Sequence, residues 1–478
     1  MQRLSGTDSL FLAGETPAWH QHVAGLSIID PTGVPEFSFD AVVSSIGARL
    51  PVLPKLTWRL KEVPLRLSRP VWVTDRDFDL RRHVRRIEVP APGGPRQTAA
   101  IVGQILSEQL DRAHPLWEIW YLDGLINGRV GFMMKYHHCL LDGVAGSGMA
   151  ALLLDMEPAP ARQEVAQPDP VPEPSGASLL IQSVMPGFAT PWNLARYGVQ
   201  LTRRVVDIIG YWASRRPKLD VGAMVQAPRT SFNHKIGPRR AMAFTSVAID
   251  DLRALSRHCD VKLNDVMLAV CSGALRTYLE DRGELPERTL TAGVPISTRI
   301  EGDASLDNQI SYIVVPLATN VAEPAERLRT IYRHTCAAKE MNAALRPHPL
   351  GSIGTTAPPW ALVAAMRLAY RSHLLSYTPG MTNTLISNVA GPTFPLYIAG
   401  ARLVGIFSAS VILEGMGVNI TVFSFEQRVD FGIQVDPELV PEVWELADAI
   451  PDALAELMAA ADLGAPAPIE DAFGVRSG

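Results

Sequence analysis

The segment YHHCLLDG, residues 136–143, places two histidines side by side at the end of an apolar run. The preceding stretch GRVGFMMKYHH, residues 128–138, predicts a β-strand, in which successive side chains point to opposite faces of a sheet. His138 should then share a face with Met134, and His137 should point the other way. The segment therefore predicts a β-strand that ends in the two histidines.

Three interpretations of the paired histidines are open: metal ligands, packed core residues, or a catalytic base with a supporting neighbour. Adjacent strand residues are poorly placed to bind one metal ion, and no third ligand follows at a suitable spacing, so we expect no metal site. Asp142 and Gly143 predict a tight turn directly after the strand. A histidine held there, opening toward a cavity, suits a general base. Asp142 has an alternative role as the cap of the following helix.

Composition narrows the class of protein. A chain of 478 residues predicts two or three domains, and a net charge of −5 gives no basic field for nucleic acid. The four cysteines are far apart and predict a reducing, cytoplasmic setting. We expect no signal peptide, and no stretch of about 18 apolar residues that would span a membrane. Contact with a membrane would then be peripheral.

A proline-rich stretch divides the chain. Residues 158–178 contain six prolines, which predicts an exposed, semi-extended linker. Strand and helix patterns alternate on both sides of it, which predicts α/β lobes. We therefore expect an N-terminal lobe at 1–157, a linker region at 158–230, and a C-terminal lobe at 231–478.

Within the linker region, Thr190 and Pro191 predict the start of a helix. Its apolar stripe comprises Leu194, Tyr197, Leu201, Val205, Ile208 and Trp212, and its basic residues include Arg196, Arg203, Arg204, Arg215, Arg216 and Lys218. Two interpretations stay open. The helix packs on a lobe with solvated arginines, or it lies on an anionic membrane or lipid-droplet surface.

The pattern HHxxxDG, residues 137–143, is similar to the signature of the CoA-dependent acyltransferase superfamily. Further stretches resemble the bacterial wax ester synthase/diacylglycerol acyltransferase family in the same order along the chain: PVWVTDRDFDLRRHVRR (70–86), PLWEIW (115–120), LNDVMLAVCSGALRTYL (263–279), GVPISTR (293–299) and SNVAGP (387–392). The resemblance covers nearly the whole chain outside the linker. By these motifs the chain is identified as a member of that family.

The resemblance implies an α/β fold of two chloramphenicol-acetyltransferase-like lobes with a tunnel between them. It also implies transfer of a long-chain acyl group from acyl-CoA to the hydroxyl of diacylglycerol, with long-chain alcohols as further acceptors. Acyl-CoA would be a co-substrate, and no cofactor or metal is expected. The enzyme would be cytoplasmic and peripherally associated with the inner face of the membrane or with lipid droplets. Oligomeric state is not indicated.

The resemblance assigns the general base to the second histidine, His138, with His137 beside it. An imidazole with a pKa near 6.5 can accept the proton of an attacking alcohol and return it to the departing thiolate. Asp142 is expected to be a positioning residue that pairs with an arginine, for which Arg299 is the candidate.

Five further residues are candidates for substrate binding: Gly143, Trp117, Asn264, Ser387 and Asn388. Trp117 is expected to be either a packed core aromatic or part of the lining of the acyl tunnel. Asn264 is a candidate cap for a helix beginning at Asp265. Ser387 and Asn388 precede a Gly-Pro turn, and either form that turn or supply donors near the oxyanion.

Two rival functions remain at this stage. One is a condensation-type enzyme that acts on carrier-protein thioesters and amines. It is disfavoured because the PLW, Asn-Asp and SNVAGP-like stretches do not belong to that group. The other is a non-enzymatic lipid-droplet or lipid-binding protein, which the intact HHxxxDG pattern argues against.

Overall fold

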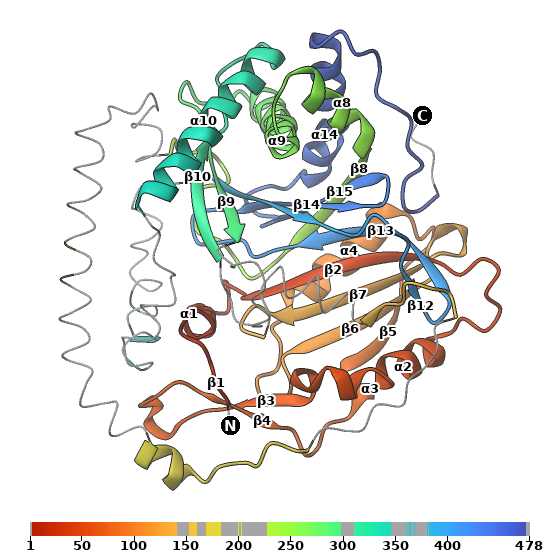
Figure 1. Ribbon diagram of the computed structural model, residues 1–478, viewed down its shortest axis with the longest axis vertical. Helices are drawn as coiled ribbons and strands as arrows, with labels where there is room; N and C mark the ends of the chain where they lie inside the picture. Colours follow the sequence, from red (N-terminus) through yellow and green to blue (C-terminus); the bar gives the residue numbers. More distant parts are fainter. Residues whose placement is uncertain are drawn as a thin grey trace.

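The computed structural model describes residues 2–140, 153–159, 169–182, 227–297, 310–345 and 382–474, with isolated positions at 199, 202, 360, 363, 364, 368 and 380. The fold is built on two six-stranded sheets, one in each lobe (Figure 1). A small third sheet lies beside the first lobe and contains β1 (Gln2–Arg3), β4 (Val71–Thr74) and β3 (Trp58–Lys61).

The first sheet has the strand order β12-β13-β2-β7-β6-β5. Its strands are β2 (His22–Asp30), β5 (Val84–Glu88), β6 (Trp117–Asp123), β7 (Val130–His137), β12 (Tyr397–Ile398) and β13 (Ala401–Ala409). Neighbouring strands are antiparallel except β5 and β6, which are parallel. The predicted strand is therefore β7, an interior strand of this sheet, and it ends at His137.

The second sheet has the order β10-β9-β11-β14-β15-β8. Its strands are β8 (Ala241–Ala248), β9 (Thr291–Ser297), β10 (Ile310–Pro316), β11 (Thr384–Ala390), β14 (Val418–Phe425) and β15 (Arg428–Val435). Here β11 runs parallel to both β9 and β14, and the other pairs are antiparallel. The predicted α/β class and two-lobed arrangement are confirmed.

Helices cover the sheets in layers. One face of the second sheet carries α8 (Ile249–His258), α9 (Leu263–Glu280), α10 (Pro324–Leu345) and α14 (Val443–Ala460) (Figure 1). The first lobe contributes α1 (Gly6–Gly14), α2 (Phe39–Gly47), α3 (Leu80–His83) and α4 (Pro95–Ser107), with short 3₁₀ turns η1 (Leu50–Val52), η2 (Pro54–Thr57), η3 (Pro64–Arg66) and η4 (Ile126–Gly128).

Helix α4 joins the two lobes. Its buried Ile105 shares one apolar cluster with Met133 of β7 and with Met242 and Phe244 of β8. On the opposite face of β7, Met134 packs in a separate cluster with Trp117. The face alternation predicted along β7 is therefore confirmed, and it separates an interlobe core from the outer core of the first lobe.

The two sheets do not divide at the proline-rich stretch. Strands β12 and β13 follow β11 in the chain, yet β13 pairs with β2 of the first lobe from Arg402 opposite Asp30 to Ala409 opposite Ala24. The segment 231–478, expected to form one lobe, thus supplies two strands to the other sheet.

The described residues 169–178 of the predicted linker are exposed or half-buried. Residues 169–175 have no regular structure, but Val171 N–H donates to Thr74 Oγ1 at 2.8 Å and Glu173 pairs with Lys61 at 2.7 Å. Residues 176–182 form a helix whose Leu179 is fully buried. This part of the linker is therefore fixed against the small sheet. The predicted helix at 190–213 lies almost entirely outside the described residues. No helix within the described ranges is long and apolar enough to cross a bilayer.

Candidate active site

His138 follows the end of β7 and is held on two sides. Its backbone N–H donates to the carbonyl of Gln21 at 2.7 Å, just before β2, and its ring stacks on Phe11 of α1 with centroids 4.1 Å apart and planes 8° apart. The backbone N–H of His137 donates to Leu116 O at 3.0 Å, just before β6. Neighbouring strands and α1 together fix the position of the histidine pair.

His137 faces a buried carboxylate. Its Nδ1 accepts a hydrogen bond from the backbone N–H of Cys139 at 3.0 Å, so in the neutral ring the hydrogen belongs on Nε2. That Nε2 lies 3.7 Å from Oε2 of Glu15, and both side chains are at most 3% exposed. His137 is thus a buried residue whose two ring nitrogens face a backbone N–H and a carboxylate.

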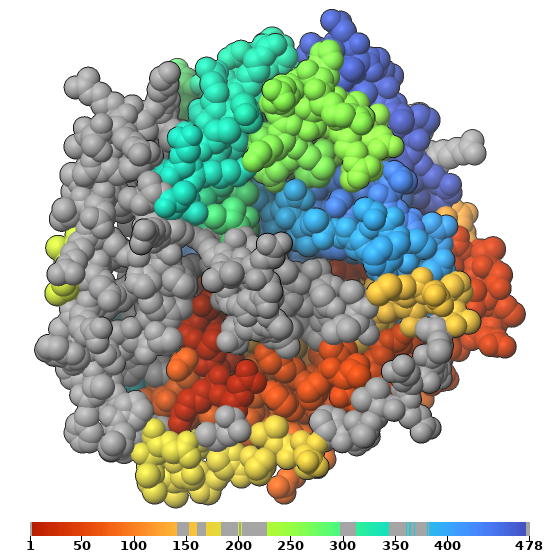
Figure 2. Space-filling view, in the orientation of Figure 1, coloured from red at the N-terminus to blue at the C-terminus, as the bar shows by residue number. Residues whose placement is uncertain are grey.

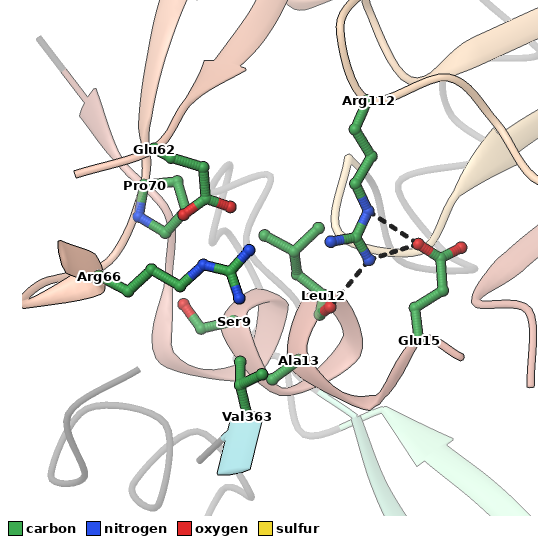
Figure 3. Close-up of a pocket in the computed structure, with 9 residues that line it drawn as sticks. All are labelled: Ser9, Leu12, Ala13, Glu15, Glu62, Arg66, Pro70, Arg112 and Val363. Carbon is green, nitrogen blue, oxygen red and sulfur yellow. Dashed lines mark hydrogen bonds and ion pairs between the residues drawn. The ribbon is translucent and has the colours of Figure 1, made fainter. Parts of the chain in front are cut away.

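Glu15 is held ionised by its partners. Arg112 Nε donates to Glu15 Oε2 at 2.9 Å, Arg112 Nη2 contacts the same oxygen, and Nη2 also reaches Leu12 O at 3.0 Å. Burial by itself would raise the pKa of Glu15, but His137 and Arg112 lower this pKa to about 2. Figure 3 shows the paired Arg112 and Glu15 beside α1.

Sequence reasoning missed Phe11, Glu15 and Arg112. A local signal was present: Ser5 and Asp8 have the spacing of a helix start, and Ser5 Oγ does accept from Asp8 N–H at 3.1 Å. That signal predicts α1 but not the contact of α1 with residues more than a hundred positions later. Such a contact depends on the pairing of β2 with β7, which no local pattern specifies.

A small pocket lies next to Glu15. Its volume is about 70 Å³, and its lining consists of Ser9, Leu12, Ala13, Glu15, Glu62, Arg66, Pro70, Arg112 and Val363 (Figure 3). Arg66 and Arg112 reach it from different parts of the first lobe. The pocket therefore lies between Glu15 and Arg66 of the η3 turn.

Trp117 is a packed core aromatic. It is fully buried, its Nε1 donates to Leu56 O at 2.7 Å, and it stacks on His83 at 4.5 Å. In the sheet it lies opposite Tyr136. The PLW-like stretch and the histidine pair therefore lie at the ends of adjacent strands, β6 and β7.

Asn264 and Asn388 meet in the second lobe. Asn388 Nδ2 donates to Asn264 Oδ1 at 3.3 Å, which joins β11 to the first turn of α9. Asn264 is not the predicted cap, because α9 begins at Leu263 and Asp265 Oδ2 accepts from the Lys262 backbone N–H at 3.2 Å. Ser387 precedes Asn388 on β11 and is half-buried.

Other candidates fall outside the described residues: Asp142, Gly143 and Arg299. Within the described ranges, no cluster of histidine, cysteine and carboxylate side chains is arranged to hold a metal ion. Cys139 is buried, and burial raises the pKa of its thiol well above the usual value. Its thiolate is therefore disfavoured as a nucleophile.

The chain has two α/β lobes, the second of which contributes β12 and β13 to the sheet of the first, and paired histidines at the end of β7. The first condensation domain of the calcium-dependent antibiotic synthetase has the same fold, with a TM-score of 0.56 at 13% identity over 98% of this chain and 99% of that domain. Residues 4–267 match the wax ester synthase/diacylglycerol acyltransferase catalytic domain, and residues 306–458 match the WS/DGAT C-terminal domain. The chain belongs to the wax ester synthase/diacylglycerol acyltransferase family.

Two relatives span nearly the full length. A putative diacylglycerol O-acyltransferase of Mycobacterium tuberculosis is 34% identical, over 97% of this chain and 91% of the relative. The solved structure of the wax ester synthase/diacylglycerol acyltransferase from Marinobacter aquaeolei VT8 is 28% identical with a TM-score of 0.69, over 97% of this chain and 100% of that one. The similarity to both therefore extends over nearly the whole of this chain.

Proposed function

We propose that this enzyme transfers a long-chain acyl group from acyl-CoA to the hydroxyl of diacylglycerol, and to long-chain alcohols as further acceptors. Family membership over both domains is the single observation that carries the acyltransferase activity. The acceptor follows from the relatives named diacylglycerol O-acyltransferase and wax ester synthase. The histidine motif then assigns the chemistry within the site.

In the proposed reaction His138 is the general base. The alcohol oxygen attacks the thioester carbonyl while His138 takes its proton, and collapse of the tetrahedral intermediate breaks the C–S bond. The imidazolium then returns the proton to the CoA thiolate. A positioned general base contributes about 10²–10⁴-fold to such a step. The scheme needs no acylated residue, which fits the buried, protonated Cys139.

The neighbours of His138 have positioning roles in this proposal. Phe11 fixes the plane of the ring by stacking, and the Glu15–His137 pair secures the turn at Cys139. Asp142 and Arg299 remain the proposed ion pair that orders the loop. Trp117 supports β6 beside the site, and Gly143 permits the turn after Asp142.

In the second lobe, Asn388 is proposed as a donor toward the developing oxyanion. Its contact with Asn264 holds the side-chain amide in one orientation, and a preorganised donor of this kind stabilises a tetrahedral intermediate. Ser387, the preceding residue, is the alternative donor.

Because diacylglycerol and long-chain alcohols are almost insoluble, the enzyme must draw them from a lipid surface. We place it at the inner face of the membrane or on lipid droplets, as a peripheral protein. The basic, amphipathic pattern at 190–213 supports this location.

The function is tested with purified protein, palmitoyl-CoA, and either dioleoylglycerol or hexadecanol, by following free CoA and the ester product. Both acceptors should release CoA in step with ester formation. Hydrolysis of palmitoyl-CoA without ester would reject acyl transfer. Transfer to an amine in preference to either alcohol would instead support the condensation-type activity.

A further inference from the structure

The η3 turn presents a leucine to solvent in a strained conformation. Leu65 and Arg66 have φ angles of +56° and +51°, in the left-handed region that non-glycine residues seldom adopt. The Leu65 side chain is 80% exposed. A bulky apolar residue that is both strained and exposed gains nothing from the fold itself, so a contact outside the chain is the natural explanation.

Two further apolar side chains are exposed beside it. Leu67 is 37% exposed, and Ile181 of the helix at 176–182 is 73% exposed. That helix is fixed next to the turn, because buried Leu179 packs in one cluster with Val63. Figures 1 and 2 show the helix at the lower edge of the molecule, beside the connection between β3 and β4.

Basic side chains surround these apolar residues. Arg66 is exposed on the same turn, and Arg3 reaches the segment through Ser68 Oγ at 2.9 Å. Lys61 and Arg59 are paired with Glu173, and Glu62 is a second carboxylate near the turn. The net charge of these side chains is positive, because Arg66, Arg3, Lys61 and Arg59 outnumber the two carboxylates. Exposed apolar residues beside a net positive charge match the interfacial zone of an anionic bilayer, where apolar side chains enter the acyl boundary and basic ones stay among the headgroups.

The turn also leads to the candidate active site. Arg66 lines the 70 Å³ pocket together with Arg112 and Glu15 (Figure 3). Glu15 in turn lies 3.7 Å from His137. A lipid surface resting on this edge would therefore lie on the same side of the first lobe as Glu15 and Arg112.

We propose that Leu65, Leu67 and Ile181, with Arg66, form a lipid-docking tip that rests on an anionic phospholipid surface. The proposal rests on the proposed function, which requires an acceptor held in a lipid surface. It adds the residues that would contact that surface. The strained turn holds Leu65 outward before docking, so little ordering is left for the bound state.

The test uses the full-length protein and sedimentation with phosphatidylcholine vesicles, with and without phosphatidylglycerol, at low and high salt. The variant Leu65→Gly with Ile181→Ser should partition into phosphatidylglycerol-containing vesicles at least about tenfold more weakly, because two side chains that would insert are lost. Glycine accepts a positive φ, so the melting temperature should not fall. Met156→Ser, which removes an apolar side chain of similar exposure (68%) elsewhere, is the control and should partition like the wild type.

Partitioning that is unchanged in the Leu65→Gly, Ile181→Ser variant would overturn the docking tip. So would a change in oligomeric state in place of a change in vesicle binding, since the tip would then be a protein interface. Activity on a short-chain soluble alcohol without vesicles separates the two proposals. If the wild type binds vesicles through the tip but acylates no alcohol, the proposed function fails and the docking surface stands.

Discussion

At the residue scale, His137 and His138 are adjacent and yet meet different neighbours. His138 stacks on Phe11 at 4.1 Å, whereas His137 lies between the Cys139 backbone and Glu15. Strand geometry alone predicted that they would diverge. What each side chain meets depends on α1, which comes from the other end of the lobe.

Replacing His138 should separate chemistry from stability. His138→Ala should lower kcat by about 10² or more, the scale of a lost general base, with little change in melting temperature because the turn at Cys139 keeps its bond to His137. Single-turnover kinetics with palmitoyl-CoA and thermal melts check both quantities. A variant with near wild-type kcat would remove His138 from the mechanism.

His137 should behave in the opposite way. His137→Ala leaves the Cys139 N–H without its acceptor and leaves Glu15 with Arg112 as its remaining charged partner, so the free energy of unfolding should fall by about 1–3 kcal/mol. The residual folded enzyme should lose less kcat than His138→Ala. Denaturant titration beside steady-state kinetics measures both. Loss of kcat equal to that of His138→Ala, at unchanged stability, would contradict a positioning role.

Glu15 gives the protein an acid-sensitive contact. Its pKa in the folded state is about 2, lowered from 4.5, so its stabilising contribution is complete above pH 4.5 and disappears as the pH falls toward 2. Over that interval the contribution is roughly 3 kcal/mol. Glu15→Gln should therefore be less stable than the wild type at neutral pH, and the difference should shrink as the pH falls from 4.5 toward 2.

Denaturant unfolding at a series of pH values measures this difference. Glu438→Gln, which breaks an ion pair between largely exposed side chains with Arg239, is the control and should cost little at any pH. A Glu15→Gln variant as stable as the wild type at neutral pH would mean that the carboxylate contributes nothing to the fold.

At the scale of single elements, the Asn-Asp stretch at the start of α9 divides into two roles. Asp265 is buried and accepts bonds from the Lys262 backbone and from Thr335 of α10 at 2.7 Å. Asn264, one residue earlier, faces Asn388 of β11. Asp265 therefore joins α9 to α10, and Asn264 joins α9 to β11.

This division makes a matched pair of variants. Asp265→Ala should lower the free energy of unfolding by about 1–3 kcal/mol, because the buried Thr335 hydroxyl and the Lys262 N–H lose their acceptor. Asn264→Ala should change stability by less than about 0.5 kcal/mol, as partly exposed substitutions generally do, and should lower kcat about tenfold through the loss of order at Asn388. Equal loss of stability in both variants would assign the whole stretch to folding.

The sequence predicted elements best where local periodicity was strong. The alternation of side chains along β7 was predicted from its own residues, and the structure places Met134 and Met133 in separate apolar clusters on its two faces. The start of α9 was misplaced because a carboxylate inside the helix, Asp265, satisfies the Lys262 N–H, which leaves Asn264 within the first turn. The contacts of Glu15 lie beyond any local pattern, because they form only after β2 and β7 pair.

At the scale of the whole molecule, β13 links the lobes. It pairs with β2 in the first sheet, and Ile406 N–H donates to Asp430 Oδ2 of β15 in the second at 2.8 Å. Arg428 donates to Val404 O at 3.0 Å from the same side. Nothing in the spacing of residues 397–409 distinguishes a strand of one lobe from a strand of the other. The pairing of β13 with the first sheet could therefore not be predicted.

Because β13 completes the first sheet, we expect that the first lobe does not fold by itself. In a fragment of residues 1–157, β2 would become an edge strand with unpaired backbone groups, and buried Leu26 and Ile28 would lose the neighbours that β13 and β8 supply. We expect the fragment to be insoluble or unfolded by circular dichroism, and co-expression with residues 158–478 to recover a soluble complex. A fragment that unfolds cooperatively by itself would show that the first sheet is complete without β13, and the two lobes would then be independent folding units.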